Sequence, residues 1–128
     1  MEKSSNKLKA LTDEIIDAAF SVHRTLGPGL FESAYEACLE YELTNRGYTV
    51  ERQKSMPVTY KSFEIDCGYR LDILIENEVP LELKSVEEIH PIHKAQILSY
   101  MRLGSFEIGY LMNFNVKLFK DGIYRYKL

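Results

Sequence analysis

Two short runs of alternating residues, separated by a turn, constrain this chain of 128 residues most strongly. The turn is Glu76-Asn77-Glu78. The apolar residues of the two runs are Leu71, Ile73 and Ile75 before the turn, and Val79, Leu81 and Leu83 after it. An apolar residue at every second position is typical of a β-strand with one buried face. The two runs therefore predict a β-hairpin.

The length of the turn decides which side chains face each other across this hairpin. A three-residue loop makes every buried pair apolar, with Ile75 opposite Val79, Ile73 opposite Leu81, and Leu71 opposite Leu83. The same register puts Asp72 opposite Glu82 on the other face, with Lys84 two residues further on. A two-residue loop would slip the pairing by one and separate Asp72 from the other two. The hydrophobic pairing alone thus predicts a cluster of two carboxylates and an amine.

The chemistry of this cluster favours a cation. Carboxylates that face each other directly repel, and a divalent cation between them offsets the repulsion while the lysine holds a water or a phosphate nearby. The alternative is a solvated sheet face, on which Glu and Lys alternate with Leu. A Glu-x-Lys sequence on its own is common, so the cluster alone leaves both interpretations open.

The rest of the chain predicts helices around the strands. Apolar spacing, Gly and Pro place the helices at about 7–26, 30–45 and 91–103. Further strands are expected at 49–53, 58–60, 63–66 and 107–114, and a tight hairpin at Asp121-Gly122 between 116–120 and 123–127. This order predicts one α/β (α+β) domain over residues 1–128, in which helices flank a mixed sheet.

Composition excludes several classes of protein. The net charge is −3, so a phosphate-bearing partner needs a local patch rather than a basic field over the whole surface. No apolar run approaches the length of a membrane span, and the first residues lack the apolar core of a signal peptide. We therefore expect a cytoplasmic protein with no membrane partner.

Two helices carry polar residues that can join the cluster. Glu32 begins the second helix, with Tyr35 one turn on, and Gln96 and Tyr100 share a face of the third helix, with His93 one turn earlier. Each has an ordinary explanation. Glu32 also suits the positive end of its helix. Glu36 shows that the same helix carries a carboxylate that needs no catalytic role. Gln96 and Tyr100 can simply belong to the polar face of an amphipathic third helix.

In this order, these residues resemble the PD-(D/E)XK nuclease superfamily, particularly its exonuclease and recombination-nuclease branch. The matching residues are Asp72, then Glu82-Leu83-Lys84, then a helix with Gln96-x-x-x-Tyr100. The segment Gly29-x-x-Glu32-x-x-Tyr35 is similar to the small GxxExxY family within that superfamily. The resemblance runs from the first helix to Asn113-Phe114 and implies a restriction-endonuclease-like core.

The resemblance also implies roles for individual residues. Asp72, Glu82, the Leu83 carbonyl and Glu32 would bind Mg²⁺ or Mn²⁺, whose hard character suits oxygen ligands. Lys84 would position the attacking water and steady the phosphate, and Gln96 and Tyr100 would orient the nucleophile or the backbone. DNA is the expected substrate of such a nuclease, cut without strong sequence specificity.

Several points are left open by the sequence. Pro80 implies that its strand lies at an edge or contains a bulge. His23 and His93 are possible extra ligands, although a packed, hydrogen-bonded histidine is the expected role of His23. The alternative function is a catalytically silent adaptor that binds nucleic acid or protein. A homodimer or a protein partner would supply the grip on DNA that an acidic chain lacks.

Overall fold

A sheet of five strands in the order β1-β4-β5-β6-β7 lies at the centre of the fold. The structure is a computed structural model that describes residues 2–128, with side chains from residue 5 onward. The strands are β1 (Val50–Ser55), β4 (Arg70–Ile75), β5 (Val79–Lys84), β6 (Ile108–Asn113) and β7 (Ile123–Lys127). All neighbours are antiparallel except β5 and β6, which are parallel because a helix connects them. The predicted mixed sheet is confirmed.

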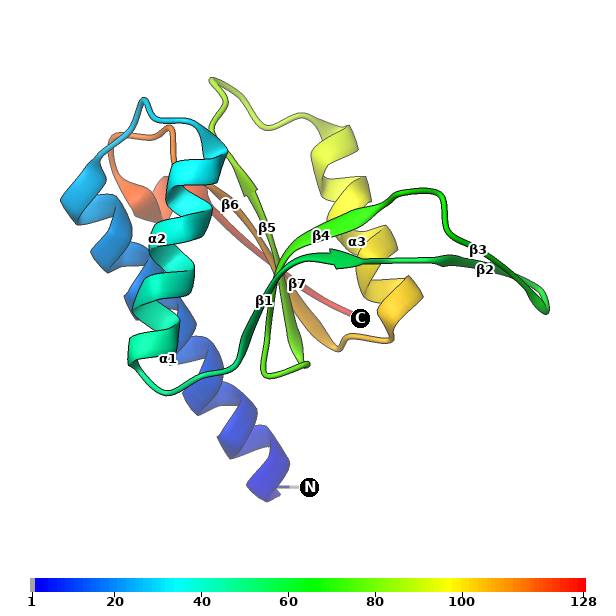
Figure 1. Ribbon diagram of the computed structural model, residues 1–128. Helices are drawn as coiled ribbons and strands as arrows, with labels where there is room; N and C mark the ends of the chain where they lie inside the picture. The colour runs from blue at the N-terminus through cyan, green and yellow to red at the C-terminus, as the bar shows by residue number, and fades with distance from the viewer. Residues whose placement is uncertain (1) are drawn as a thin grey trace.

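Helices cover both faces of this sheet (Figure 1). Helices α1 (Glu2–Leu26) and α2 (Glu32–Asn45) share a core with Ile73 and Leu81 on one face. On the other face, Ile97 of α3 (Pro91–Gly104) packs on Leu111 of β6. Because both faces are covered, the middle strands are buried on both sides. Within residues 2–128, no helix is long and apolar enough to cross a membrane.

The register of the central hairpin is as predicted close to its turn. Ile75 pairs with Val79 and Ile73 pairs with Leu81, which leaves the expected three-residue loop. The expected pairing of Leu71 with Leu83 is wrong, because the ladder between β4 and β5 ends at Ile73 and Leu81. Leu71 instead packs with Leu74 and Tyr100, in a different cluster from Leu83.

Pro80 lies in a central strand, so the expectation of an edge strand or a bulge is wrong. β5 has β4 on one side and β6 on the other. The N–H of Leu83 points toward β4, and the alternation along the strand therefore turns the Pro80 nitrogen toward β6. Pairing with β6 begins only at Leu81, so the missing N–H of the proline removes no ladder bond.

The expected tight hairpin at Asp121-Gly122 is also wrong. These residues end a 3-10 helix, η1 (Phe119–Gly122), and β7 pairs with β6 instead of with residues 116–120. Burial of Phe119 explains the difference, because its ring packs on Phe114 at 4.7 Å between centroids and holds the segment against the core. At Gly122, an added Cβ would lie 2.1 Å from the backbone oxygen of Asn113, so only glycine fits.

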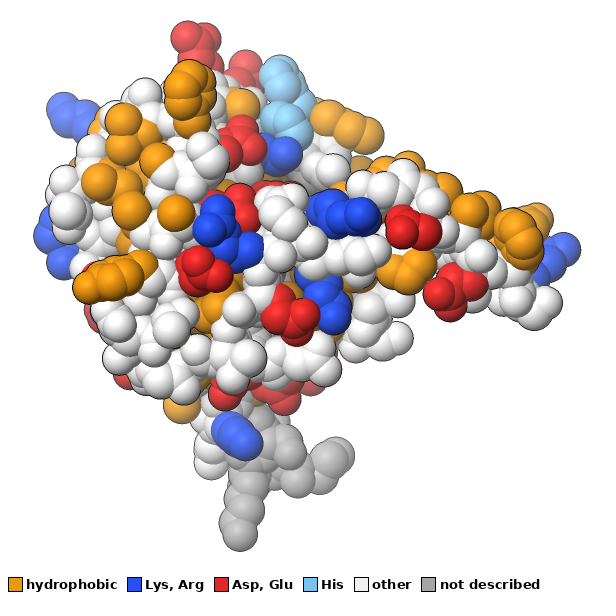
Figure 2. All heavy atoms as spheres, viewed as in Figure 1, with side chains coloured by type: hydrophobic (Ala, Val, Ile, Leu, Met, Phe, Trp, Pro, Cys, Tyr) orange, Lys and Arg blue, Asp and Glu red, His pale blue; other side chains and the backbone are white. Residues whose placement is uncertain are grey.

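A two-stranded arm, residues 58–65, projects from one end of the sheet (Figure 1). It consists of β2 (Val58–Tyr60) and β3 (Phe63–Ile65), which pair only with each other. Tyr60 and Phe63 are 64% and 63% exposed, and Figure 2 shows hydrophobic side chains spread along the arm. The arm is therefore an apolar ribbon that no other helix or strand of residues 2–128 covers.

Candidate active site

The side chains of Asp72 and Glu82 join β4 to β5 just beyond the point where the backbone hydrogen bonds between these strands end. The N–H of Asp72 donates to Glu82 Oε1 at 3.1 Å, and the N–H of Leu83 donates to Asp72 Oδ2 at 2.9 Å. Each carboxylate therefore accepts a hydrogen bond from the backbone of the opposite strand. These crossed bonds fix both carboxylates in the opening between β4 and β5, with α2 and α3 on either side.

Glu82 lies in an environment that disfavours its charge. Glu82 is only 3% exposed. Burial, together with the neighbouring Asp72 carboxylate, raises the pKa of Glu82 from 4.5 to about 9. The Lys84 ammonium acts in the opposite direction but does not cancel the effect. A divalent cation would offset both the burial of the Glu82 charge and its repulsion by Asp72. The carboxylate oxygens of the pair are ligands that Mg²⁺ and Mn²⁺ prefer.

The two carboxylates do not make a complete metal-binding set by themselves. Among the side chains that the structure describes, no three His, Cys, Asp or Glu residues are grouped so that they hold a metal ion. A cation at Asp72 and Glu82 would therefore need further ligands from backbone carbonyls and water, as is usual for Mg²⁺. The donor set fits a hard cation that keeps part of its hydration shell.

Lys84 ends β5, and β6 fixes this end. The N–H of Phe114 donates to the Lys84 carbonyl at 2.9 Å, while the Asn113 side chain binds both the N–H and the carbonyl of Val86. The Lys84 charge acts to lower the pKa of Glu82 and of His93, so the ammonium lies within electrostatic range of both groups. The predicted proximity of Lys84 to the acidic pair is therefore present in the structure.

Glu32 lies at the exposed entry to α2, near the same end of β5. The Ser85 hydroxyl donates to the Leu30 carbonyl at 2.6 Å and so ties the start of α2 to β5. Burial, Lys84 and His90 lower the pKa of His93, whereas the Glu32 carboxylate opposes this shift. The Glu32 charge is therefore within electrostatic range of His93. Tyr35 does not accompany Glu32, because it is fully buried and its hydroxyl donates to the Gly27 carbonyl at 2.6 Å.

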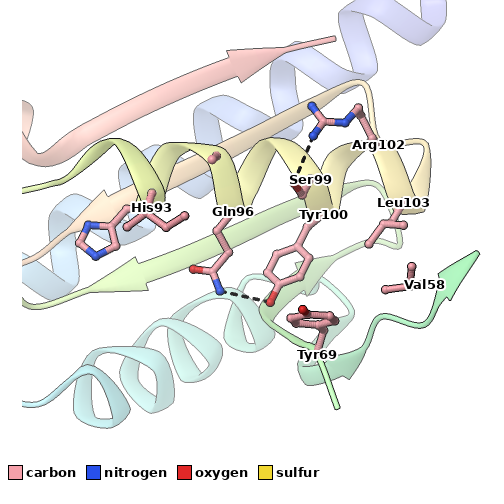
Figure 3. A pocket seen from close by; sticks show the side chains of 10 residues that line it. Val58, Tyr69, His93, Gln96, Ser99, Tyr100, Arg102 and Leu103 are labelled. Carbon is pink, nitrogen blue, oxygen red and sulfur yellow. Dashed lines mark hydrogen bonds between the residues drawn. The ribbon is translucent and has the colours of Figure 1, made fainter. Parts of the chain in front are cut away.

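Helix α3 brings Gln96 and Tyr100 to the acidic pair from the other face of the sheet. The Gln96 amide donates to the Tyr100 hydroxyl at 3.4 Å (Figure 3). Burial raises the pKa of Tyr100, and the charges of Glu82 and Asp72 raise it further. The Tyr100 ring packs in one cluster with Leu71, the residue before Asp72. Tyr100 therefore lies next to the strand that carries Asp72, with Gln96 hydrogen-bonded to it.

Glu36 and Gln53 also belong to the site, although they lie outside the motifs that the sequence predicts to form it. Gln53 Nε2 donates to the Glu36 oxygens at 3.0 and 3.2 Å and to Asp72 Oδ1 at 3.3 Å. Arg52 pairs with Glu36 at 3.2 Å, which offsets the burial of this carboxylate. The spacing offered a clue, since Glu36 precedes the inward residues Leu39 and Leu43 by three and seven positions.

His23 lies away from these groups, as expected for a packed histidine. It is 8% exposed, its Nε2 lies 2.7 Å from the Val116 carbonyl oxygen, and its ring stacks on Phe119 at 5.0 Å between centroids. His93, in contrast, lies in the first turn of α3, within range of the charges of Lys84 and Glu32. Of the two histidines, only His93 therefore lies on the side of Lys84 and Glu32.

Comparison with known proteins agrees with this arrangement. A family model described as the PD-(D/E)XK nuclease superfamily matches residues 9–126, which include every residue placed at the site above. Neither the curated proteins nor the solved structures gave a match. The mixed sheet flanked by helices is consistent with the fold of this superfamily. The chain belongs to the PD-(D/E)XK nuclease superfamily.

Proposed function

We propose that this protein is a metal-dependent nuclease of the GxxExxY type that hydrolyses DNA phosphodiester bonds without strong sequence specificity. The observation that carries the proposal is the crossed pair of hydrogen bonds that holds Asp72 and Glu82 together beside Lys84. A folded protein gains little from a buried carboxyl group next to a carboxylate. Such a pair is therefore best explained by a cation that binds it.

Asp72 and Glu82 would hold Mg²⁺ or Mn²⁺, with the Leu83 carbonyl and Glu32 as further oxygen ligands. The Leu83 N–H points toward β4, and the carbonyl of a strand residue points to the same side as its N–H, so this oxygen also faces the opening. Glu32 would act directly or through a bound water from the entry to α2. The ion, when bound, supplies a hydroxide-like nucleophile and neutralises charge on the phosphate.

The remaining side chains would orient the reactants. The Lys84 ammonium, which lies next to the acidic pair, would hold the attacking water and stabilise the charge that develops on the phosphate. Gln96 and the Tyr100 hydroxyl, which are hydrogen-bonded to each other, would orient the nucleophile or the DNA backbone from the side of α3. These contacts read phosphate and water rather than bases, as expected for cleavage without sequence preference.

Cleavage of DNA with Mg²⁺ or Mn²⁺ tests this function. We expect the wild-type protein to cut, and Lys84→Ala to lose the activity while its unfolding midpoint stays unchanged. Lys117→Ala, which removes an exposed lysine from the connection after β6, is the matched control and should retain activity. DNA binding without cleavage under either ion would instead support the adaptor function.

A further inference from the structure

A groove of about 560 Å³ runs along α3 (Figure 3). One wall is α3 itself, and the other is formed by Val58 of the arm and by Tyr69, which directly precedes β4. Its main lining residues are Val58, Tyr69, Gln96, Ser99, Tyr100 and Leu103. The groove is therefore largely apolar, with polar groups at both ends.

We propose that this groove holds the base of an unpaired nucleotide that adjoins the cleaved phosphate. The substrate would then be a single strand or an unpaired end. The inference rests on the proposed nuclease function and names its substrate. Gln96 and Tyr100 carry the link, because both line the groove and Tyr100 packs in one cluster with Leu71, the residue before Asp72. A molecule in the groove therefore lies close to the strand that carries Asp72.

Tyr69 provides the surface on which a base can stack. It is 48% exposed, and its ring contacts the edge of Tyr100, with 6.4 Å between centroids and an angle of 66° between planes. This contact supports the ring from one side and leaves the rest open to the groove. Stacking of a base on an aromatic side chain contributes about 1–3 kcal/mol and depends little on the sequence. Val58 and Leu103 extend the apolar surface beside it.

Arg102 offers a phosphate contact at the far end of the groove. Its Nη2 donates to the Ser99 hydroxyl at 3.1 Å, and the guanidinium forms no ion pair with any side chain described from residue 5 onward. Its other donors are therefore available to an anion. Arg102 is six residues after Gln96, which corresponds to about 9 Å along a helix. A strand that leaves the acidic pair along α3 would reach this cation at its next phosphates.

The chemistry of the groove favours an unpaired strand over a duplex. In a duplex, the faces of the bases are covered by their stacked neighbours, so they cannot contact the apolar lining of the groove. Duplex binding relies mainly on basic side chains, whereas this chain has a net charge of −3. An unpaired base exposes both faces and can enter the groove.

Binding in Ca²⁺, an ion commonly used to permit binding without cleavage, tests the groove separately from catalysis. Fluorescence anisotropy would compare a short oligothymidylate with a hairpin duplex of the same number of nucleotides. We expect tighter binding of the single strand, and a loss of about fivefold to about a hundredfold in affinity for Tyr69→Ala. Tyr69→Phe, which keeps the aromatic ring, should bind as the wild type does. Tyr41→Ala, an exposed tyrosine of α2 that does not line the groove, is the control.

Each outcome decides one of the two proposals. Equal affinity for both DNAs, or unchanged affinity in Tyr69→Ala, overturns the groove proposal even if the protein cleaves DNA in Mn²⁺. Tyr69-dependent binding of the single strand without any cleavage leaves the groove standing and refutes the nuclease function. A dimer in sedimentation that Tyr69→Ala dissociates, with no oligonucleotide binding, would show that the arm of a second copy occupies the groove, and would also overturn the proposal.

Discussion

The side-chain amide of Gln53 donates a hydrogen bond to Asp72 Oδ1 at 3.3 Å while it also binds both oxygens of Glu36. One amide thereby connects a carboxylate of the central sheet to a buried carboxylate of α2. Gln53 has a φ of 52°, a left-handed conformation that a non-glycine residue keeps only where its surroundings fix it. The orientation of Asp72 therefore depends on α2 as well as on its own hairpin.

Removal of the Gln53 amide should weaken metal binding. In Gln53→Gly the backbone tolerates the left-handed conformation, so the loss comes from the side-chain hydrogen bonds to Asp72 and Glu36. We expect a smaller rise in the unfolding temperature on addition of Mn²⁺ than in the wild type. Lys61→Gly, at a φ of 57° in the turn of the arm, is the matched control. A rise equal to that of the wild type would show that Gln53 does not orient Asp72.

Glu36 and Glu32 should differ in what they do for the protein. Glu36 is buried and pairs with Arg52, so Glu36→Ala should lower the free energy of unfolding by about 1–3 kcal/mol. Glu32 is exposed, and Glu32→Ala should change stability by less than about 0.5 kcal/mol while it reduces DNA cleavage. Urea unfolding and cleavage assays on both variants measure the two effects. Loss of stability without loss of activity in Glu32→Ala would contradict the assigned roles.

Stability of the metal-free protein should fall as the pH rises from about 4.5 to about 9, because of Glu82. The folded state keeps a proton on Glu82 that the unfolded state releases. The contribution of this proton to the free energy of unfolding is therefore complete below pH 4.5 and is lost by about pH 9. The slope for one proton is at most about 1.4 kcal/mol per pH unit. Urea unfolding at several pH values measures it, and Glu82→Gln should flatten it.

The same proton makes metal binding depend on pH. A cation must displace it, so the stabilisation by Mn²⁺ should increase as the pH rises through the same window. Thermal unfolding with and without Mn²⁺ at each pH measures this increase. Stabilisation that is independent of pH would mean that Glu82 does not bind the ion.

Gly122 should tolerate no side chain. A Cβ at this position would meet the Asn113 carbonyl oxygen, which is backbone and cannot move away freely. Gly122→Ala should therefore destabilise the protein by about 1–3 kcal/mol, as other overpacked sites do. Gly29→Ala lacks this steric clash, because no atom lies within 4 Å of an added Cβ, and carries only the conformational cost of a side chain at a φ of 100°. Denaturant unfolding of both variants tests the difference.

The sequence predicted those features that depend on local pattern. Alternation of apolar residues specified the hairpin and its three-residue loop, and with it the proximity of Asp72, Glu82 and Lys84. The spacing of Gln96 and Tyr100 correctly placed both on one face of a helix. A period of two residues or of one helical turn is sufficient for each of these inferences.

The features that the sequence did not predict depend on contacts between distant segments. The ladder stops at Asp72 because side chains replace backbone partners there, which no local pattern reveals. Phe119 turned the expected Asp121-Gly122 hairpin into a 3-10 helix by packing into a core made of other elements. Glu36 has the sequence pattern of an ordinary helix carboxylate, because its link to Asp72 runs through Gln53, which lies on a different element, β1.

The anomalous scattering of Mn²⁺ in crystals of the protein shows whether Asp72 and Glu82 bind one ion between them. We expect a peak at about 2.1 Å from carboxylate oxygens of both residues, the distance typical of ions of this size. We also expect the peak to be absent in crystals of Asp72→Asn grown under the same conditions. No peak between these two carboxylates at saturating Mn²⁺, or a peak that Asp72→Asn leaves unchanged, would contradict the proposed metal site.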